Sequence, residues 1–252
     1  MIAMIRTLPR CVIAIALLST LAVAGCGRPE VARGINDPYE AQNRQVHEFN
    51  RNVDKVLLRP ASQGYGTIIP DPIKQGVSNV AGNLSMPSYI LNDVLQARFD
   101  DAAHNFTRLL INSTFGLAGV LDPATAWGLA ERGSDFGETL NVWGFAEGHY
   151  IEVPFLGPST KRDAVGVVVN FVIDPLGYML PKPERYIAPA TAAASTIGDR
   201  YRFGDTIDSI LYDSTDSYAQ ARLFYLESRR FQLGGTQDES LDDYDDYDAF
   251  YE

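Results

Sequence analysis

The stretch LAVAGC at positions 21–26 constrains this chain most, because it fixes the compartment in which the rest must fold. Arg6 and Arg10 flank the start of a mainly apolar run, 11–23, which has the length of a signal-peptide core and is too short to span a bilayer. The run leads into Val-Ala-Gly-Cys, which fits the bacterial lipobox. We therefore expect residues 1–25 to be a lipoprotein signal peptide and Cys26 to carry an N-acyl diacylglycerol group.

An ordinary cleavage site at 22–24 is the alternative, and it would leave Cys26 as a stray free thiol in an exported protein. In the lipoprotein interpretation that cysteine is the residue that is acylated. One acyl chain holds a protein to a membrane only marginally, whereas two or more anchor it stably. Gly27, which is not an aspartate, favours sorting to the outer membrane. We expect a lipid anchor in its periplasmic leaflet.

Cleavage after residue 25 would leave 227 residues with no cysteine besides Cys26, so the fold cannot rely on disulfides. A domain of this size can bury about 70% of its unfolded surface. The cleaved segment holds two arginines and no acidic residue, which leaves 19 basic against 32 acidic residues and a formal net charge of −13. Such a charge does not favour binding to nucleic acid or to an anionic surface.

The mature chain shows no internal repeat and divides into three parts. Residues 26–36 are expected to form a lipidated tether, and residues 37–235 one helical domain. Residues 236–252 contain eight acidic and no basic residues and have no periodic apolar face. Such a segment cannot bury enough apolar surface to order itself, and we expect an acidic disordered tail.

Four Asp-Pro pairs predict helix starts, because proline fits the first helical turn and an aspartate before it can cap free amide groups. Asp37 is followed by Glu40 at the spacing of a capping box. The helix that they introduce is expected over about 38–58, with an apolar stripe, and to stop at Arg59-Pro60. The pairs lie at 37–38, 71–72, 122–123 and 174–175.

Further apolar stripes at helical spacing lie within 73–84 and 103–110. Pro87 is expected to open another helix, and Ser214 or Thr215 a late one that ends at Gly234-Gly235. Only 150–155 alternates like a strand, and only briefly. These signals predict a mainly α fold with little or no β structure.

The segment AVGVVVNFVI at 164–173 has Asn170 as its only polar side chain. Thr160 and Asp163 form a capping box before it, which favours a helix that is apolar on all sides. Such a helix needs protein or lipid all around it. It is either a buried core helix or a segment dipped into one membrane leaflet, because ten residues cannot cross about 30 Å at 1.5 Å each.

Motifs for catalysis are missing from the sequence. His47, His104 and His149 are far apart and are expected to be ordinary surface or cap residues. There is no HExxH, CxxC or G-x-S-x-G, so metal hydrolysis, zinc binding and a nucleophile elbow lack support. We expect no enzyme, no metal and no cofactor. Instead, residues 133–163 are dense in glycine and aromatic residues, which indicates either a packed loop or the lining of a passage.

Several long motifs in order behind the lipobox resemble the MlaA (VacJ) family of outer-membrane lipoproteins. They are NDPYEAQNRQVHEFNRNVD (36–54), NFTRLLINSTFGLAGVLDPA (105–124), DFGETLNVWGFAEGHYIEVPFLGPSTKRD (135–163) and DSTDSYAQARLFYLESRR (213–230). The resemblance covers nearly the whole mature chain up to about residue 235.

This resemblance implies a helical ring lodged in one leaflet of the outer membrane, with a polar channel through it. Stray phospholipid would pass from the outer leaflet to a soluble periplasmic carrier, and a trimeric porin would stand beside the ring. The family's motif positions carry over as residues that shape the ring: Asn43, Arg44, Phe49, Asn50, Asp135, Phe136, Gly137, Gly144, Tyr150, Arg162 and Asp163.

Two other functions remain open at this point. A structural lipoprotein would bridge envelope components, with the acidic tail as its binding arm. A phospholipid-degrading enzyme on the same membrane face is the second. A passive channel needs a polar lining for head groups and an apolar side for tails, but no nucleophile or metal. The lack of catalytic motifs fits the channel.

Overall fold

The computed structural model describes residues 34–234. The predicted signal peptide, Cys26, most of the predicted tether and the predicted acidic tail at 236–252 therefore lie outside the described residues. Within that range the chain is mainly helical and contains one two-stranded antiparallel hairpin. The predicted mainly α fold with little β structure is confirmed.

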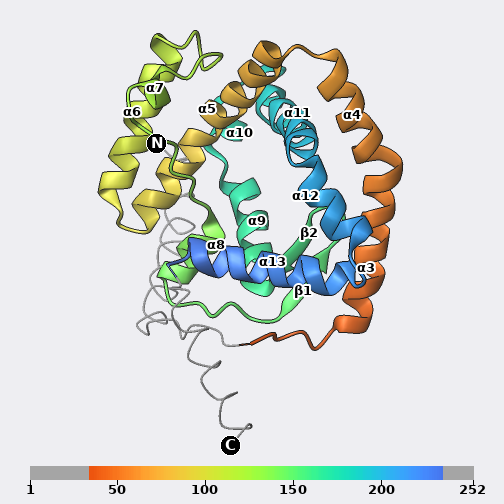
Figure 1. The fold of residues 1–252 in the computed structure, drawn as a ribbon. Coiled ribbons are helices and arrows are strands. Elements are labelled where there is room, and N and C mark those ends of the chain that lie inside the picture. Colours follow the sequence, from red (N-terminus) through yellow and green to blue (C-terminus); the bar gives the residue numbers. More distant parts are fainter. Residues whose placement is uncertain (1–33, 235–252) are drawn as a thin grey trace, which may run out of the picture.

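The first half of the described chain consists of helices that follow one another closely (Figure 1). They are α3 (Glu40–Val53), the π-helical segment η1 (Asp54–Leu58), α4 (Arg59–Ile68), α5 (Asp71–Leu95), α6 (Phe99–Thr114), α7 (Pro123–Ala126) and α8 (Phe136–Val142). Strands β1 (Tyr150–Val153) and β2 (Gly157–Thr160) then pair, with Tyr150 opposite Thr160.

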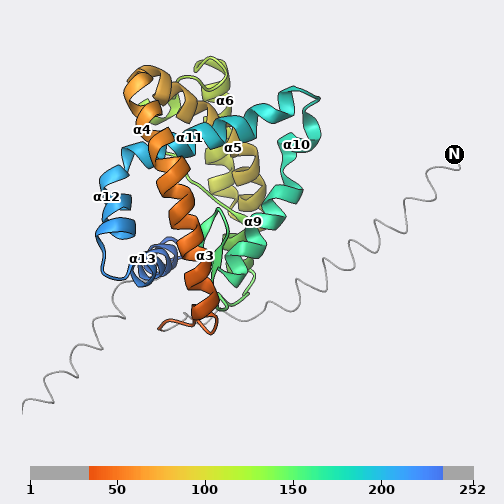
Figure 2. The ribbon, with the colours of Figure 1, turned by 90° about the vertical axis from the view of Figure 1, so that its right-hand side faces the viewer.

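The second half of the described chain packs against the first. Its elements are α9 (Lys161–Ile173), α10 (Pro175–Met179), the short 3₁₀ turn η2 (Glu184–Tyr186), α11 (Ile187–Arg202), α12 (Gly204–Asp208), the π-helical segment η3 (Ser209–Asp213) and α13 (Ser217–Gln232). Helix α9 lies beside α8, and α11 lies beside α5 and α4. In Figure 2, α12 and α13 lie on one side of α3, and α9 and α10 lie on the other.

The helices are arranged as a ring that α13 closes (Figure 1). Helix α5 packs against α6 and α11, and α11 also packs against α4. Helix α8 packs against α9. Helix α13 crosses the molecule from the neighbourhood of α8 to that of α3, and contacts β2 and η3 on its way.

Two prolines that were expected to mark helix boundaries lie inside continuous helical runs. The predicted stop at Arg59-Pro60 is wrong, because α3, η1 and α4 follow one another without a break. Pro60 stands in the first turn of α4, directly after the wider turn of η1, so its missing N–H removes little. Pro87 does not open a helix but lies within α5, which contacts with α6 and α11 support on two sides.

Two of the four predicted Asp-Pro caps are formed. Asp122 accepts a hydrogen bond from the Thr125 amide, and Asp174 accepts bonds from two amides of α10. Asp71, in contrast, is the first residue of α5 and pairs with Lys74 instead of capping.

The predicted capping box of Asp37 and Glu40 is wrong. Helix α3 has Tyr39 at its N-cap and no side-chain cap, because residues of α13 bind the Asp37 carboxylate. The late helix is likewise capped by neither of the predicted residues, Ser214 and Thr215, since Asp216 caps α13 by accepting a bond from the Ala219 amide.

The apolar stripes of the early helices point largely outward. Helix α6 shows this most clearly, because it buries Ala102, Asn105, Arg108 and Asn112. Its predicted apolar residues Phe106 and Leu110 are exposed, as are Phe49, Val56, Leu57 and Ile73 on α3, η1 and α5. The helices are amphipathic as predicted, but much of the apolar surface lies outside.

Helix α9 is not enclosed by protein. Thr160 caps it by accepting a bond from the Asp163 amide, as predicted. The helix buries Arg162, Asp163 and Gly166 but exposes most of its valines, and Phe171 is 85% exposed. The interpretation as a buried core helix is therefore wrong. No helix of the described part of the chain is long and apolar enough to cross a membrane.

Candidate functional site

The described chain has a polar interior and an apolar exterior. Its most deeply buried side chains include Asn92, Asp93, Asn105 and Arg108. Exposed large apolar side chains occur on helices throughout the fold, above all on α9 and around α7. A water-facing domain buries apolar groups and rarely exposes large apolar patches. This distribution indicates that much of the outer surface contacts lipid or another protein.

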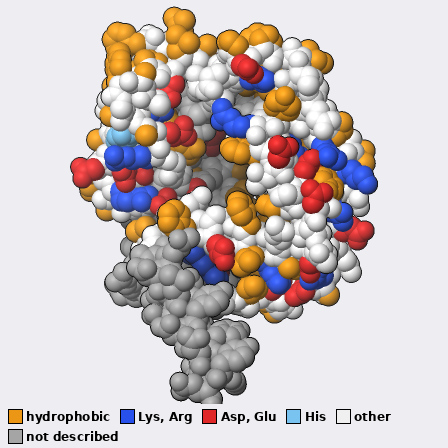
Figure 3. Space-filling view, in the orientation of Figure 1, with side chains coloured by type: hydrophobic (Ala, Val, Ile, Leu, Met, Phe, Trp, Pro, Cys, Tyr) orange, Lys and Arg blue, Asp and Glu red, His pale blue; other side chains and the backbone are white. Residues whose placement is uncertain are grey.

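The middle of the molecule is hollowed. Figure 3 shows the opening on the face of Figure 1, with charged side chains of both signs and some apolar ones around it. Apolar side chains also gather at the upper end of this view, over the α6–α7 region. There the structure exposes five large apolar residues: Phe115, Leu117, Val120, Leu121 and Trp127.

Asn43 and Asn50 fasten α3 to the β-hairpin by replacing backbone partners. The Asn43 Oδ1 accepts a bond from the Glu152 amide at 3.0 Å, and its Nδ2 donates to Asp37 Oδ1 at 2.8 Å. Two helical turns on, Asn50 accepts from the Phe155 amide at 2.7 Å and donates to the Val153 carbonyl at 3.0 Å. An asparagine offers both donor and acceptor, which is what a strand edge needs.

Asp37 joins the start of the described chain to α13. Its carboxylate accepts hydrogen bonds from the Tyr218 hydroxyl and the Arg222 guanidinium, in addition to Asn43. Burial alone would raise the pKa of Asp37, but these bonds outweigh it and the pKa lies below its usual value. Tyr150, buried against Tyr218, donates to Glu152, and burial raises its pKa. We call these residues the α3–α13 cluster: Asp37, Asn43, Tyr150, Glu152, Tyr218 and Arg222.

Arg44 adds a charge contact at the edge of this cluster. Its two terminal nitrogens donate to the Asp216 carboxylate at 3.0 and 2.8 Å, and its guanidinium lies 4.5 Å from the centre of the Tyr218 ring. The bonds from Arg44 lower the pKa of Asp216 to about 2. Phe49 lies outside the cluster and packs edge-on against Phe155, with ring centres 5.1 Å apart.

A second group of predicted residues meets at the other end of α13. Arg229 pairs with Asp135, the N-cap of α8, and with Asp163 in the first turn of α9. Arg162 donates to Asp163 at 3.2 Å and to Asn141 of α8 at 2.8 Å. Burial opposes ionisation of Asp163, but the two arginines outweigh it and lower its pKa. We call these residues the α8–α13 cluster: Asp135, Asn141, Arg162, Asp163 and Arg229.

Two glycines of the motif are required by geometry. A Cβ on Gly137 would lie 2.5 Å from Asp163 Oδ1 and 2.9 Å from Arg229 Nη2, so a side chain there would displace the α8–α13 cluster. Gly144 ends the turn after α8 with a φ of 88°, a left-handed conformation that favours glycine.

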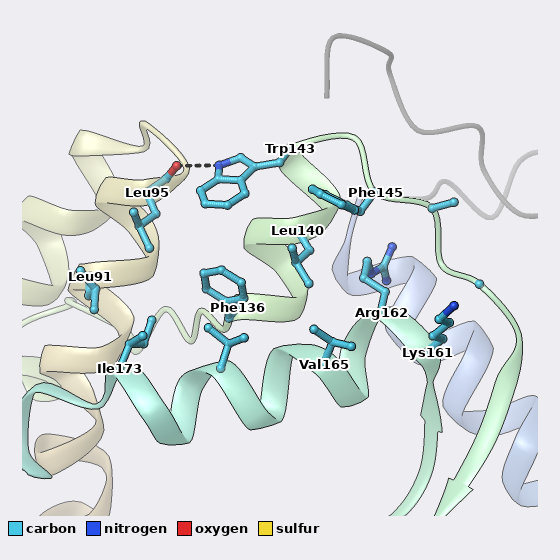
Figure 4. A pocket seen from close by; sticks show the side chains of 13 residues that line it. Leu91, Leu95, Phe136, Leu140, Trp143, Phe145, Lys161, Arg162, Val165 and Ile173 are labelled. Atoms are coloured by element: carbon cyan, nitrogen blue, oxygen red, sulfur yellow. Dashed lines mark hydrogen bonds between the residues drawn. The ribbon is translucent and has the colours of Figure 1, made fainter. Parts of the chain in front are cut away.

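Phe136 belongs to neither cluster and lines an apolar cavity of about 820 Å³ between α5, α8 and α9 (Figure 4). It packs edge-on against Trp143, whose indole N–H donates to the Leu95 carbonyl at 3.0 Å. The lining is made by Leu91, Leu95, Phe136, Leu140, Trp143, Phe145, Ala146, Gly148, Lys161, Arg162, Val165, Val169 and Ile173.

The sequence profile of the MlaA lipoprotein family matches residues 35–232, which include both clusters and the cavity. The chain belongs to the MlaA lipoprotein family. The resemblance drawn from the sequence motifs is thereby confirmed. The motif residues of the two clusters join α3, the hairpin, α8 and α9 to α13.

Proteins of several bacteria are similar to this chain over much of their length. A protein of Rickettsia bellii is 34% identical over 191 residues, which cover 75% of this chain and 74% of the relative. The intermembrane phospholipid transport system lipoprotein MlaA of Haemophilus influenzae is 35% identical over 172 residues, 66% of this chain and 67% of the relative. The protein of that name from Escherichia coli is 29% identical over 231 residues, 88% of each chain.

The fold is also similar to a solved structure described as the structural basis for maintenance of bacterial outer membrane lipid asymmetry. The two structures superpose with a TM-score of 0.67 at 28% sequence identity. The superposition covers 78% of this chain and 98% of the other.

Several members of the two clusters were not predicted from the sequence. Tyr218, Arg222 and Arg229 all lie on α13, in the last stretch that carries the resemblance to MlaA, but nothing local marks them as partners of residues far away in sequence. His47 is buried between Glu152 and Ser217, so its prediction as a surface or cap residue is wrong.

A further buried ion pair joins the two halves of the ring between α11 and η1. Arg200 of α11 donates to both oxygens of Asp54 at 2.7 and 2.9 Å, and to Asp208 at 2.6 Å. Asp54 opens the π-helical segment η1, and Tyr212 of η3 also donates to it at 2.7 Å. Hydrogen bonds from Arg200 and Tyr212 outweigh burial and lower the pKa of Asp54.

Buried amides link the middle of the ring. Gln96 donates to Thr139 at 2.8 Å, and Thr139 donates to Asn92 at 2.9 Å, which joins α5 to α8. Asn105 of α6 donates to Asp93 at 2.8 Å, and burial raises the pKa of Asp93. Within residues 34–234, no three His, Cys, Asp or Glu side chains are grouped so that they could hold a metal ion.

Proposed function

We propose that this chain is an outer-membrane lipoprotein that removes mislocalised phospholipid from the outer leaflet and passes it toward the periplasm. Membership of the MlaA family and the names of its relatives support the transport role. The likeness to a structure concerned with outer-membrane lipid asymmetry supports the same role. Acylation of Cys26 and a position in the periplasmic leaflet are part of this proposal.

The observation that supports this mechanism is the distribution of side chains: the fold buries polar side chains around its hollow and exposes apolar ones on its outside. A phospholipid crosses hydrocarbon slowly because its charged head loses its hydrogen-bonding partners there. A body with an apolar outside can lie among acyl chains, while a polar centre offers partners to the head. Helices satisfy their own backbone groups, which a structure in lipid requires. The hollow would thus provide a path without a covalent step.

No catalytic role is needed for this transfer. The charged side chains of the two clusters pair with one another and fasten helices, so they are already engaged in holding the fold. In this proposal a trimeric porin supports the ring in the membrane and a soluble periplasmic carrier receives the lipid. These partners come from the family resemblance.

Surface-exposed phospholipid in the source bacterium tests the function. Deleting the gene should increase the phosphatidylethanolamine that a membrane-impermeant amine reagent labels on intact cells. The full chain should restore the low level, and the Cys26→Ala chain should not. A deletion that leaves the labelling unchanged would refute the proposal.

The same assay separates the channel from its two alternatives. Removing residues 236–252 should leave the rescue largely intact, whereas a structural lipoprotein that binds through its tail would lose it. A phospholipid-degrading enzyme would release free fatty acid or head groups from labelled lipid on addition of purified protein. The transfer proposal expects intact lipid.

A further inference from the structure

The described chain begins at the edge of the apolar cavity. Arg230 Nη2 donates both to the Gly34 carbonyl at 2.9 Å and to Glu147 Oε1 at 2.8 Å, so one nitrogen holds these two residues together. Glu147 stands between Ala146 and Gly148, and both of those residues line the cavity. Whatever precedes Gly34 therefore leaves the fold beside this cavity.

The cavity has the chemistry of a hydrocarbon site. Its volume of about 820 Å³ is in the range of about 300–1,000 Å³ that is usual for ligand sites. Leucine, valine and aromatic side chains make most of the lining, and the indole N–H of Trp143 is already bonded. Lys161 and Arg162 are the charged residues of the lining. Arg162 bonds Asp163 and Asn141 through two of its nitrogens, and its third, Nη2, is buried without a partner among the described residues. An acyl chain would match the apolar side chains that make up most of this lining.

We propose that this cavity binds one acyl chain of the protein's own lipid anchor at Cys26. The inference rests on the acylation proposed above. Gly34 lies eight positions after Cys26, and a chain of that length reaches at most about 28 Å when extended. The anchor therefore starts within reach of the cavity edge.

The acylated cysteine carries three chains, so one of them can bind the cavity while the other two stay in the membrane. Two chains suffice to hold a protein stably on a membrane, so the third can leave the bilayer without loosening the anchor. Moving it from lipid into an apolar cavity leaves its hydrophobic burial nearly unchanged. Its covalent tether gives it an effective concentration in the range of about millimolar, which favours it over a lipid that must first be captured.

Such binding would couple the anchor to the body of the protein. The acyl chain would pass along α8 and α9, the helix whose opposite face exposes Phe171 and several valines. The tether would then fix the position of the ring in the leaflet, in addition to holding it to the membrane.

Photo-crosslinking in the full lipoprotein tests this assignment. Phe145→p-benzoylphenylalanine places the probe in the cavity lining, and Phe136→p-benzoylphenylalanine is a second probe there. Both exchanges keep an aromatic ring. The matched control, Phe171→p-benzoylphenylalanine, places the same probe on the exposed face of α9. After irradiation in cells, the protein is digested and its peptides are identified by mass spectrometry.

A probe in the cavity should link to the acylated Cys26 peptide, and the control should link to free phospholipid. Val169→Trp, which fills the cavity, should abolish the cavity crosslink. If both cavity probes link to free phospholipid or to nothing while Cys26 is acylated, the proposal is overturned and the lipoprotein assignment stands. A Cys26 peptide without acyl groups would overturn both.

Discussion

Arg229 and Asp135 form a two-point ion pair, with Nη1–Oδ2 and Nη2–Oδ1 distances of 2.9 and 2.8 Å, across 94 positions of sequence. The same guanidinium lies 3.2 Å from Asp163 Oδ1. One side chain of α13 therefore holds the first turns of both α8 and α9. The ring is closed at this end by a charge contact between helices.

Removing this contact should destabilise the fold strongly. Arg229→Met leaves the buried Asp163 carboxylate with Arg162 and two hydroxyl donors, those of Thr160 and Tyr225. Removing one partner of a buried ion pair costs about 3–5 kcal/mol. Because Arg162 remains, we expect the lower end of this range. The midpoint of thermal unfolding in detergent should fall by about 6–12 °C.

The control for Arg229→Met is Arg132→Met, because the Arg132 side chain is 51% exposed and pairs with Asp101 at the surface. Exposed ion pairs contribute about 0–1 kcal/mol. Equal shifts for the two variants would contradict the role assigned to Arg229.

Alanine substitutions of two helical glycines should have opposite effects. Gly137→Ala places a methyl group 2.5 Å from Asp163 Oδ1 and should cost about 1–3 kcal/mol through overpacking. Gly64→Ala, inside α4, meets nothing within 4 Å and should stabilise the protein by about 0.5–1 kcal/mol. Denaturant titrations in detergent measure both, and a neutral Gly137→Ala would show that the cluster tolerates displacement.

Acid should unfold the protein chiefly between about pH 4 and pH 2. Hydrogen bonds from Arg44 lower the pKa of Asp216 to about 2. Bonds from tyrosine and arginine side chains overcome burial to lower the pKa of Asp37 and Asp54, and paired arginines do so for Asp163. A carboxyl group whose pKa is lowered on folding, from about 3.9, stabilises the fold above that value. This stabilisation is lost as the pH falls through the folded pKa.

Asp93 and Glu131 act in the opposite sense, because burial raises their pKa above the usual value. They favour the folded state more as they take up protons, so their contribution to stability should rise as the pH falls from neutral toward their folded pKa values, before the acid loss begins. The free energy of unfolding, measured across this range, tests both trends. In Asp216→Asn the loss between pH 4 and 2 should be smaller than in the unsubstituted chain.

Local signals in the sequence predicted much of this fold. Thr160, Asp122 and Asp174 cap helices within three residues of themselves, so their neighbours suffice to identify them. Pro60 and Pro87 were misjudged, because a π-helical turn accommodates the first and tertiary contacts support the helix around the second.

The site was harder to predict because its partners are distant in sequence. Asp37 resembles a helix cap by its spacing to Glu40, yet its bonds go to Tyr218 and Arg222, which lie 181 and 185 positions away. Periodicity located the apolar stripes but could not state which side of the ring they face. The side that a stripe faces depends on whether lipid or protein covers it, and the sequence of a single helix does not specify which.

The lipid-facing position of the apolar exterior is the central claim, and α9 offers the most direct measurement of it. After acylation of Cys26, a cysteine introduced by Phe171→Cys is the only free thiol of the mature chain. A nitroxide label there, with the protein in bilayers, should be relaxed strongly by oxygen and weakly by a water-soluble nickel complex. Glu48→Cys, on the exposed face of α3, should show the reverse. Relaxation by nickel at position 171 equal to that at position 48 would contradict the account.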